Sequence, residues 1–341
     1  MTDLVNLTPF AATCIPSISK DDAQLVVVVV TARFDLPAAG AASVEPLPVA
    51  EDQGEVPLAD VYSDDAEPEL LREGQAAYTR PGTDVYLVGT AWTPQGKPAA
   101  QSSFGLSVGA LRKGAVVFGD RVWTHHLTLG PGRPIPFTSM PLSYARCFGG
   151  SPPNPSRSVA RAAAMNPVGR GLHNSEREAL GQPMPNFEDP AKLLSSAADR
   201  PHPCGFGPIA RHWSPRVEYG GTYDQTWMDA RLPLWPHDLD LRFFQAAAPG
   251  LRASPRLVGD EPARIIGASP DGAYVFKLPH FRLQVRFESD SGAVRRMMVL
   301  DAVEFDTDAR QTSMTWRVAL PADPLTMGGV VVRVVEPWET V

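Results

Sequence analysis

The stretch that most limits the fold is the β-branched run LVVVVVTA at residues 25–32. It is too short to span a bilayer and predicts a strand that is buried on both faces. In residues 281–288, phenylalanine, leucine and valine alternate with arginine, glutamine and glutamate. This pattern predicts a strand with one solvent-exposed face and one buried face. Short polar turns join such segments. We therefore expect a mainly β fold with antiparallel, sandwich-like sheets.

Local signals predict one clear hairpin and a few short helices. The apolar segments 104–111 and 115–123 flank Arg-Lys-Gly at 112–114, which predicts a hairpin that turns at these three residues. Segment 189–199 begins with aspartate and proline, the usual start of a helix. Segments 158–165 and 240–249 predict two or three helical turns each. The βα alternation of a doubly wound fold is missing.

Proline shapes the domain organisation. The chain has 35 prolines among 341 residues, and those in 131–215 predict an ordered but irregular segment. Aromatic and apolar residues run through that segment and argue against a linker. We expect one composite β-rich domain over 1–341, with an N-terminal β region at 1–130 and a C-terminal β region at 216–341. Segment 37–73, rich in Ala, Pro, Glu and Asp, predicts an exposed insertion or a charged edge.

Charge and cysteine content exclude several classes of function. The net charge is −7 and no lysine or arginine run is present, which argues against a nucleic-acid partner. Cys14, Cys147 and Cys204 form no CxxC pair, so we expect no metal site, and their sparse, odd number suits a reducing compartment. The N-terminal residues show no signal-peptide pattern. These features predict a cytoplasmic protein without a cofactor or a membrane partner.

Two catalytic patterns are best explained as chance matches. GLSVG at 105–109 fits the nucleophile pattern of serine hydrolases, but Ser107 lies in an alternating strand instead of a strand–turn–helix elbow. His125 and His126 are adjacent, and neighbouring side chains of a strand point to opposite faces. They would not bind one metal ion together.

The densest group of functional side chains lies in YGGTYDQTWMDARLPLWPHDLDLRFF, residues 219–244. Tyrosine, tryptophan and arginine dominate the energetics of protein interfaces. We therefore predict that this stretch forms a docking patch for a partner protein. The residues of that patch are Tyr219, Tyr223, Trp227 and Trp235.

The same stretch contains aspartates that suit a structural polar network. VFGDRVW at 117–123 and GTYDQTW at 221–227 share a glycine, an aspartate and a tryptophan, which suggests a bend closed by the carboxylate. We expect Asp224 and Asp240 to be substantially buried and bonded either to backbone N–H groups or to arginines such as Arg216 and Arg242, because an unpaired aspartate among aromatics is costly. The predicted partners are Arg121 for Asp120, Arg216 for Asp224 and Arg242 for Asp240.

A catalytic alternative uses His237 and the aspartates between 224 and 240. His237 lies beside Asp238, and a histidine oriented by a carboxylate is how a general base is built. A hydrolase of this kind would need two carboxylates converging in a pocket. The structural alternative is that Asp238 caps a short helix while His237 packs under Trp235. We favour the structural alternative because no nucleophile motif accompanies the histidine.

Nine blocks in a fixed order resemble a domain-of-unknown-function family that is encoded in bacterial type VI secretion gene clusters, over about residues 1–320. The resemblance implies a non-catalytic adaptor or chaperone that binds a secreted effector protein and helps load it onto the secretion spike. A spike or spike-tip protein would be a second partner. Some members carry pentapeptide repeats after this domain, and the sequence up to Val341 contains none. The blocks start with NLTPF (6–10), TDVYLVGTAWTPQGK (83–97), VFGDRVW (117–123), PFTSMPLSYARCFGG (136–150) and NPVGRG (166–171), and continue with MPNFEDP (184–190), CGFGPIARHWSPR (204–216), GTYDQTWMDARLPLWPHDLDLRFFQAAAP (221–249) and LVGDE (257–261).

Overall fold

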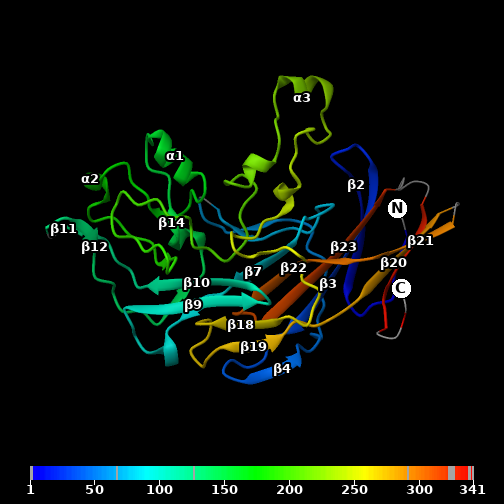
Figure 1. The fold of residues 1–341 in the computed structure, drawn as a ribbon, viewed down its shortest axis with the longest axis horizontal. Coiled ribbons are helices and arrows are strands. Elements are labelled where there is room, and N and C mark those ends of the chain that lie inside the picture. Colours follow the sequence, from blue (N-terminus) through cyan, green and yellow to red (C-terminus); the bar gives the residue numbers. More distant parts are fainter. Residues whose placement is uncertain are drawn as a thin grey trace.

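The computed structural model describes residues 3–336 and 339, except 67, 126, 290–291 and 322–326. As predicted, the protein is mainly β and contains several antiparallel sheets (Figure 1). Its helices are short. They are α1 (Arg157–Ala163), α2 (Glu176–Ala179) and α3 (Gln225–Ala230).

Sheet 1 is a six-stranded sheet in which strands from both ends of the chain are neighbours. β7 and β22 run parallel, and β23 pairs antiparallel with both β22 and β3. β3 carries the β-branched run, and Val26 to Val30 are fully buried, which confirms a strand covered on both faces. In spatial order the strands are β17 (Arg252–Ala253), β7 (Thr83–Val88), β22 (Val299–Asp306), β23 (Gln311–Pro321), β3 (Gln24–Asp35) and β2 (Ala11–Ile18).

Sheet 2 also has six strands and contains the predicted hairpin, β9–β10. The chain turns at Gly109 and Ala110, so the prediction of a turn at 112–114 was wrong. Gly109 has φ +54°, the left-handed conformation that glycine supplies at the start of a two-residue turn. In spatial order the strands are β16 (Phe187–Glu188), β10 (Leu111–Phe118), β9 (Gln101–Val108), β18 (Pro262–Ile266), β19 (Tyr274–Lys277) and β4 (Ala42–Pro46).

A third sheet of four strands shares one hydrophobic core with the other two. Val28 of sheet 1, Phe104 of sheet 2 and Val285 of this sheet all belong to that core. In the predicted alternating segment, Val285 and Phe287 are buried and Arg286 and Glu288 are exposed, as expected, but Gln284, predicted on the exposed face, is buried. The strands, in spatial order, are β1 (Leu4–Asn6), β24 (Met327–Val334), β20 (Leu283–Ser289) and β21 (Gly292–Met297).

The proline-rich segment 131–215 contains only short elements, as predicted. Part of it packs with Trp123 around a small second core that includes Phe148, and other residues, such as Phe187 and Phe206, belong to the main core. Helix α1 overlaps 158–165 as expected, whereas 240–249 forms only a single 3-10 turn at Leu241–Phe244. The remaining strands are β5 (Val61–Tyr62), β6 (Leu70–Arg72), β8 (Thr90–Trp92), β11 (Trp123–His125), β12 (Leu129–Pro131), β13 (Ser139–Pro141), β14 (Phe148–Gly149) and β15 (Arg170–Gly171).

The helix predicted over 189–199 is wrong, because this segment forms turns. The Glu188 carboxylate accepts the backbone N–H of Leu194 at 2.8 Å. The Asp199 carboxylate accepts the N–H groups of Ser195 and Ser196, both at 2.9 Å. Side-chain acceptors therefore take the donors that a helix would have bonded to backbone carbonyl groups.

Segment 37–73 is more than an exposed insertion. Its strand β4 pairs parallel with β19 at the edge of sheet 2, and its last residue, Glu73, is buried. Leu47 also belongs to the main hydrophobic core. The expectation of a merely exposed insertion or charged edge is therefore wrong for these parts of the segment, because they supply both a strand and a buried charge.

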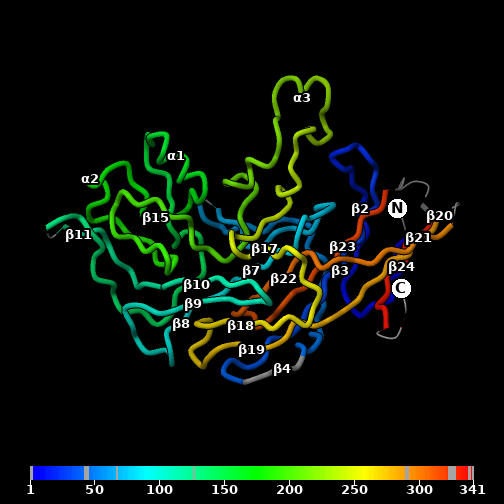
Figure 2. Tube along the Cα trace, in the orientation of Figure 1, coloured from blue at the N-terminus to red at the C-terminus, as the bar shows by residue number. Residues whose placement is uncertain are grey.

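Residues 219–240 form an arm that rises away from the sheets, with α3 at its tip (Figures 1 and 2). At the root of the arm, Leu239 and Phe244 pack against Val27 and Val29, which point from β3 to the side of sheet 1 opposite the main core. The arm therefore stands on the outer face of sheet 1.

Candidate functional site

Three sets of hydrogen bonds within the arm stabilise its conformation. At its base, the Asp238 carboxylate accepts hydrogen bonds from the backbone N–H of Thr222 at 3.0 Å and from its hydroxyl at 2.7 Å. Nearer the tip, the Trp227 indole donates to the carbonyl of Leu234 at 2.9 Å. Asp224 caps α3 by accepting the N–H of Trp227 at 2.9 Å. The arm is thus a braced loop.

Arg231 anchors the arm to the turn between β2 and β3. Its Nη1 and Nη2 atoms donate to the two carboxylate oxygens of Asp22 at 3.0 and 2.7 Å. The same guanidinium donates to the carbonyl groups of Lys20 and Trp235. The hydrogen bond from Arg231 is the main reason that the pKa of Asp22 is lowered. This anchor could not be predicted from the sequence, because its two residues lie 209 positions apart.

The four predicted docking aromatics differ in their exposure, and none of them is fully buried. Tyr219 and Trp227 are partly buried, and the guanidinium of Arg242 lies 4.2 Å from the centre of the Tyr219 ring. Trp235 packs near the arm root, and its indole donates to the Ile18 carbonyl at 3.1 Å. Tyr223 is 51% exposed. Trp235 therefore helps to anchor the arm, whereas Tyr223 is exposed to solvent.

Exposed apolar side chains gather at the tip of the arm. Met228 is 53% exposed and Leu232 is 60% exposed. Tyr223 lies edge-on against Trp227 with ring centres 4.7 Å apart, and the N–H of Leu232 donates to the Trp227 carbonyl. Single exposed apolar residues are ordinary, but a group of them on a projecting element is typical of an interaction site. We call Tyr223, Trp227, Met228 and Leu232 the arm-tip patch.

Two of the three predicted ion pairs are wrong. Arg121 is buried against Glu188, while Asp120 has a side chain that is 65% exposed and lies 3.5 Å from Arg146. Arg216 pairs with Glu73 and not with Asp224. The actual partners of Arg121 and Arg216 lie 67 and 143 positions away in the sequence. Proximity along the chain therefore pointed to the wrong carboxylate in both cases.

Asp224 and Asp240 are not substantially buried, so that prediction was wrong, but each accepts a backbone N–H, one of the two kinds of partner expected. Asp224 is exposed at the start of α3, because a capping carboxylate needs only the free N–H groups of the first turn. Asp240 does pair with Arg242, at 2.6 Å, but both side chains are more than a third exposed. The hydrogen bonds from Arg242 lower the pKa of Asp240.

The buried counterpart of these contacts lies under the arm. Glu73 and Arg216, each 1% exposed, form a bidentate ion pair. The Arg216 Nη1 atom lies 3.0 Å from Oε2 of Glu73, and Nη2 lies 2.5 Å from Oε1. Arg216 also donates to the carbonyl groups of Ile209 at 2.7 Å and Phe243 at 2.8 Å. Burial raises the pKa of Glu73, but the hydrogen bonds and charge of Arg216 outweigh burial, so its pKa is lowered overall. This pair ties segment 37–73 to both ends of the arm.

Next to this pair, charged side chains cover part of the outer face of sheet 1. Arg317 pairs with Asp301, and both are buried. Asp84 accepts the Tyr86 hydroxyl and the N–H of Ala246, both at 2.8 Å. Burial raises the pKa values of Asp84 and Tyr86. These contacts fix the chain just after the arm onto the sheet.

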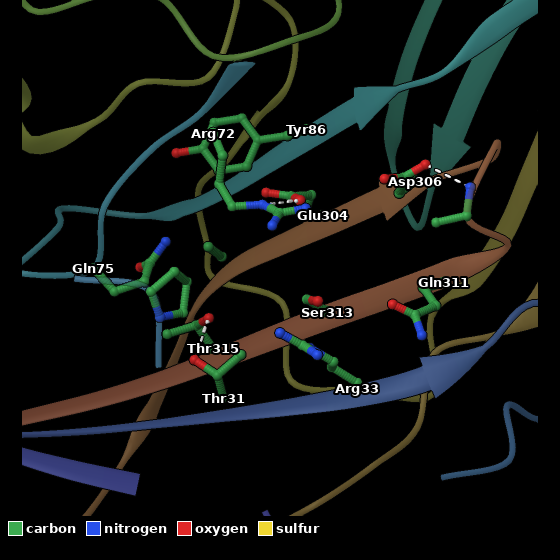
Figure 3. Close-up of a pocket in the computed structure, with 13 residues that line it drawn as sticks. Thr31, Arg33, Arg72, Gln75, Tyr86, Glu304, Asp306, Gln311, Ser313 and Thr315 are labelled. Atoms are coloured by element: carbon green, nitrogen blue, oxygen red, sulfur yellow. Dashed lines mark hydrogen bonds and ion pairs between the residues drawn. The ribbon is translucent and has the colours of Figure 1, made fainter. Parts of the chain in front are cut away.

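A polar cavity of about 180 Å³ opens on the same face (Figure 3). Its floor is formed by side chains of β3, β22 and β23, and part of its wall by Arg72 and Gln75. Figure 3 shows Glu304 and Asp306 on one side and Arg33 on the other, with Ser313 between them. This cavity could not be predicted from the sequence, because its floor joins β3 to the consecutive strands β22 and β23, which lie far from β3 in the chain.

Comparison with known proteins places the chain in a family. The model of a family described as "Uncharacterized protein conserved in bacteria (DUF2169)" matches residues 21–317. The chain belongs to DUF2169. No curated protein and no solved structure gives a significant match.

In this DUF2169 chain the candidate hydrolase residues have other contacts. His237 is exposed, and its neighbour Asp238 is bonded to Thr222 at the base of the arm. Ser107 lies inside β9, where its hydroxyl is 3.5 Å from the Arg264 carbonyl. His125 ends β11, and His126 lies outside the described residues.

Two other features are absent from the residues that the structure describes. Among them, no group of three or more His, Cys, Asp or Glu side chains is arranged to hold a metal ion. In the same part of the chain, no helix has the length and apolar character needed to cross a membrane.

Proposed function

We propose that this protein is a non-catalytic adaptor that binds a secreted effector protein through the arm-tip patch and helps load it onto a type VI secretion spike. The observation that carries the proposal is the group of exposed apolar side chains on a braced, projecting arm. Aromatic residues and methionine are enriched in protein interfaces. The link to type VI secretion rests on the resemblance of the sequence blocks.

The bracing of the arm supports a binding role. An interface loop that is ordered only on binding loses conformational entropy, and this loss weakens the complex. Here the helix cap by Asp224, the bond from the Trp227 indole to Leu234 and the bonds from Thr222 to Asp238 are all made within the protein itself. The tip can therefore present its apolar side chains without first becoming ordered.

The test uses the purified full chain and the effector encoded beside its gene. Replacing Tyr223, Met228 and Leu232 together by serine should weaken binding at least about tenfold in isothermal titration calorimetry, as expected for residues that dominate an interface. The melting temperature should stay nearly unchanged, because these side chains are more than half exposed.

The matched control replaces Leu127 and Ile135 by serine. These side chains are 95% and 64% exposed and lie outside the arm, so the control removes similar apolar surface. It should bind the effector like the unmodified protein. Unchanged binding by the arm-tip variant, or equal loss in the control, would contradict the proposal.

A further inference from the structure

The floor of the polar cavity is a row of side chains across neighbouring strands of sheet 1. In the strand register, Glu304 of β22 is opposite Ser313 of β23, and Ser313 is opposite Arg33 of β3. Adjacent strands are roughly 4.8 Å apart, so about 9.6 Å separates the backbones that carry Glu304 and Arg33. The small serine between these two long, oppositely charged side chains leaves the hollow seen in Figure 3.

Arg33 is held in place, but its charged group is available. The Gln53 amide bonds to the backbone N–H and carbonyl of Arg33, both at 2.9 Å. Gly54 packs so closely on the guanidinium that a Cβ atom there would lie 2.4 Å from Nη1. The carboxylate of Asp52 is 4.0 Å away, and within the described ranges the guanidinium makes no hydrogen bond. Such a group is suited to bind a carboxylate with two parallel hydrogen bonds.

The opposite wall provides carboxylate oxygens. Glu304 uses one oxygen to accept the Arg72 Nε at 2.9 Å, and Asp306 uses one to accept the N–H of Ala309 at 2.8 Å. The second oxygen of each carboxylate has no donor in the described part of the chain. Burial raises the pKa of Glu304, and the charge of Arg72 opposes this shift. A ligand that brings an ammonium group would give both oxygens a partner.

We propose that this cavity binds a small zwitterion of the α-amino-acid class, with its carboxylate on Arg33 and its ammonium group on Glu304 and Asp306. The two arginines and two carboxylates of the lining sum to no net charge. A ligand with a net charge would therefore leave one wall unpaired, whereas a zwitterion pairs with both. This site shares no residue with the arm-tip patch and goes beyond the adaptor function.

The dimensions suit a ligand of this size. The cavity measures about 180 Å³, and a cavity of about 150 Å³ is large enough to hold benzene. The strands that carry Arg33 and Glu304 are only two strand spacings apart, so a ligand that lies between their charged groups must be small. The hydroxyl of Ser313 and the amide of Gln311 lie on the cavity floor beside that path.

The first experiment titrates the full-length protein with free amino acids, starting with glycine, L-serine, L-asparagine and L-glutamine. We expect saturable binding of at least one of the twenty standard amino acids at a single site. The amide of the amino acid that binds lacks the carboxylate, and its N-acetyl derivative lacks the ammonium group. Each of the two should therefore bind at least about tenfold more weakly than the free amino acid. Absence of binding by all twenty, or equal binding of the two derivatives, would overturn the proposal.

The second experiment locates the site with variants. Arg33→Gln and Glu304→Gln each remove one charge and should weaken binding at least about tenfold, and Ser313→Leu should abolish it by filling the hollow. The matched control is Arg264→Gln, which replaces an exposed strand arginine on sheet 2 and should bind like the unmodified protein. Undiminished binding by folded Arg33→Gln would overturn the assignment. If a variant fails to fold, the derivatives still test the site on the unmodified protein.

Discussion

Two arginine–carboxylate pairs flank the root of the arm in opposite surroundings. Glu73 and Arg216 lie beneath it and are almost completely buried, whereas the side chains of Asp240 and Arg242 are 37% and 54% exposed. Breaking a buried pair strands a charge away from water, while water and salt replace most of an exposed pair. The comparison separates the two roles of this region: the buried pair holds the fold, and the exposed surface above it is free to bind.

The largest expected effect comes from breaking the buried pair. Arg216→Met removes both short contacts of Glu73 and leaves it only the 3.4 Å contact to Arg211, whose side chain is 42% exposed. It should therefore lower the free energy of unfolding by about 3–5 kcal/mol. Urea denaturation followed by circular dichroism measures this directly. A loss below about 1 kcal/mol, the range of an exposed pair, would show that water reaches Glu73 and that the two pairs do not differ.

The pH dependence of stability sharpens the same contrast. The pKa of Glu73 is lowered in the folded protein from an ordinary value of 4.5. Its pairing therefore stabilises the fold fully above pH 4.5, and this contribution is lost as the pH falls through the folded-state pKa. We expect the stability difference between the unmodified protein and Glu73→Gln to shrink as the pH falls below that ordinary value. A difference that is constant down to acid unfolding would contradict this cause.

The β fold could be predicted from the sequence because its signal is local. The valine run of β3 and the alternation in β20 each lie within one strand, and both were found where expected. The turn of the β9–β10 hairpin was misplaced because two glycines, Gly109 and Gly114, compete for it in the sequence. Of these two, Gly109 adopts the left-handed conformation that the turn needs.

The charge network could not be predicted because its pairs are formed between distant segments. Arg216 was assigned to nearby Asp224, but the carboxylate that reaches it is Glu73, in a segment without strong patterns. The aromatic residues at the tip were anticipated, because Tyr223 and Trp227 stand out in the sequence. Nothing in the sequence marks Met228 and Leu232 as surface residues, and only the structure shows that they are exposed on a projecting arm.

A smaller effect is expected from the helix cap on the arm. Asp224→Ala should cost about 1 kcal/mol of local stability, because it removes the acceptor for the N–H of Trp227 at the start of α3. Amide hydrogen exchange in residues 225–230 should become faster, while global unfolding hardly changes. Asp224→Ser keeps a capping group and serves as the control. Global destabilisation as large as that of Arg216→Met would show that the arm is part of the core.

The smallest effect is expected at the exposed pair. Arg242→Gln should leave the melting temperature essentially unchanged, because both members of the pair are solvated. Asp240→Asn, which keeps an acceptor for the N–H of Arg242, should behave in the same way. A clear fall in melting temperature for Arg242→Gln would mean that its contact with the Tyr219 ring is needed to hold the arm.

Hydrogen–deuterium exchange of the protein with and without its effector tests the central claim most directly. We predict that binding slows exchange in the arm, residues 219–240, above all around α3, and leaves the buried segment around Glu73 unchanged because it is already protected in the free protein. Protection elsewhere with no change in the arm would contradict the account.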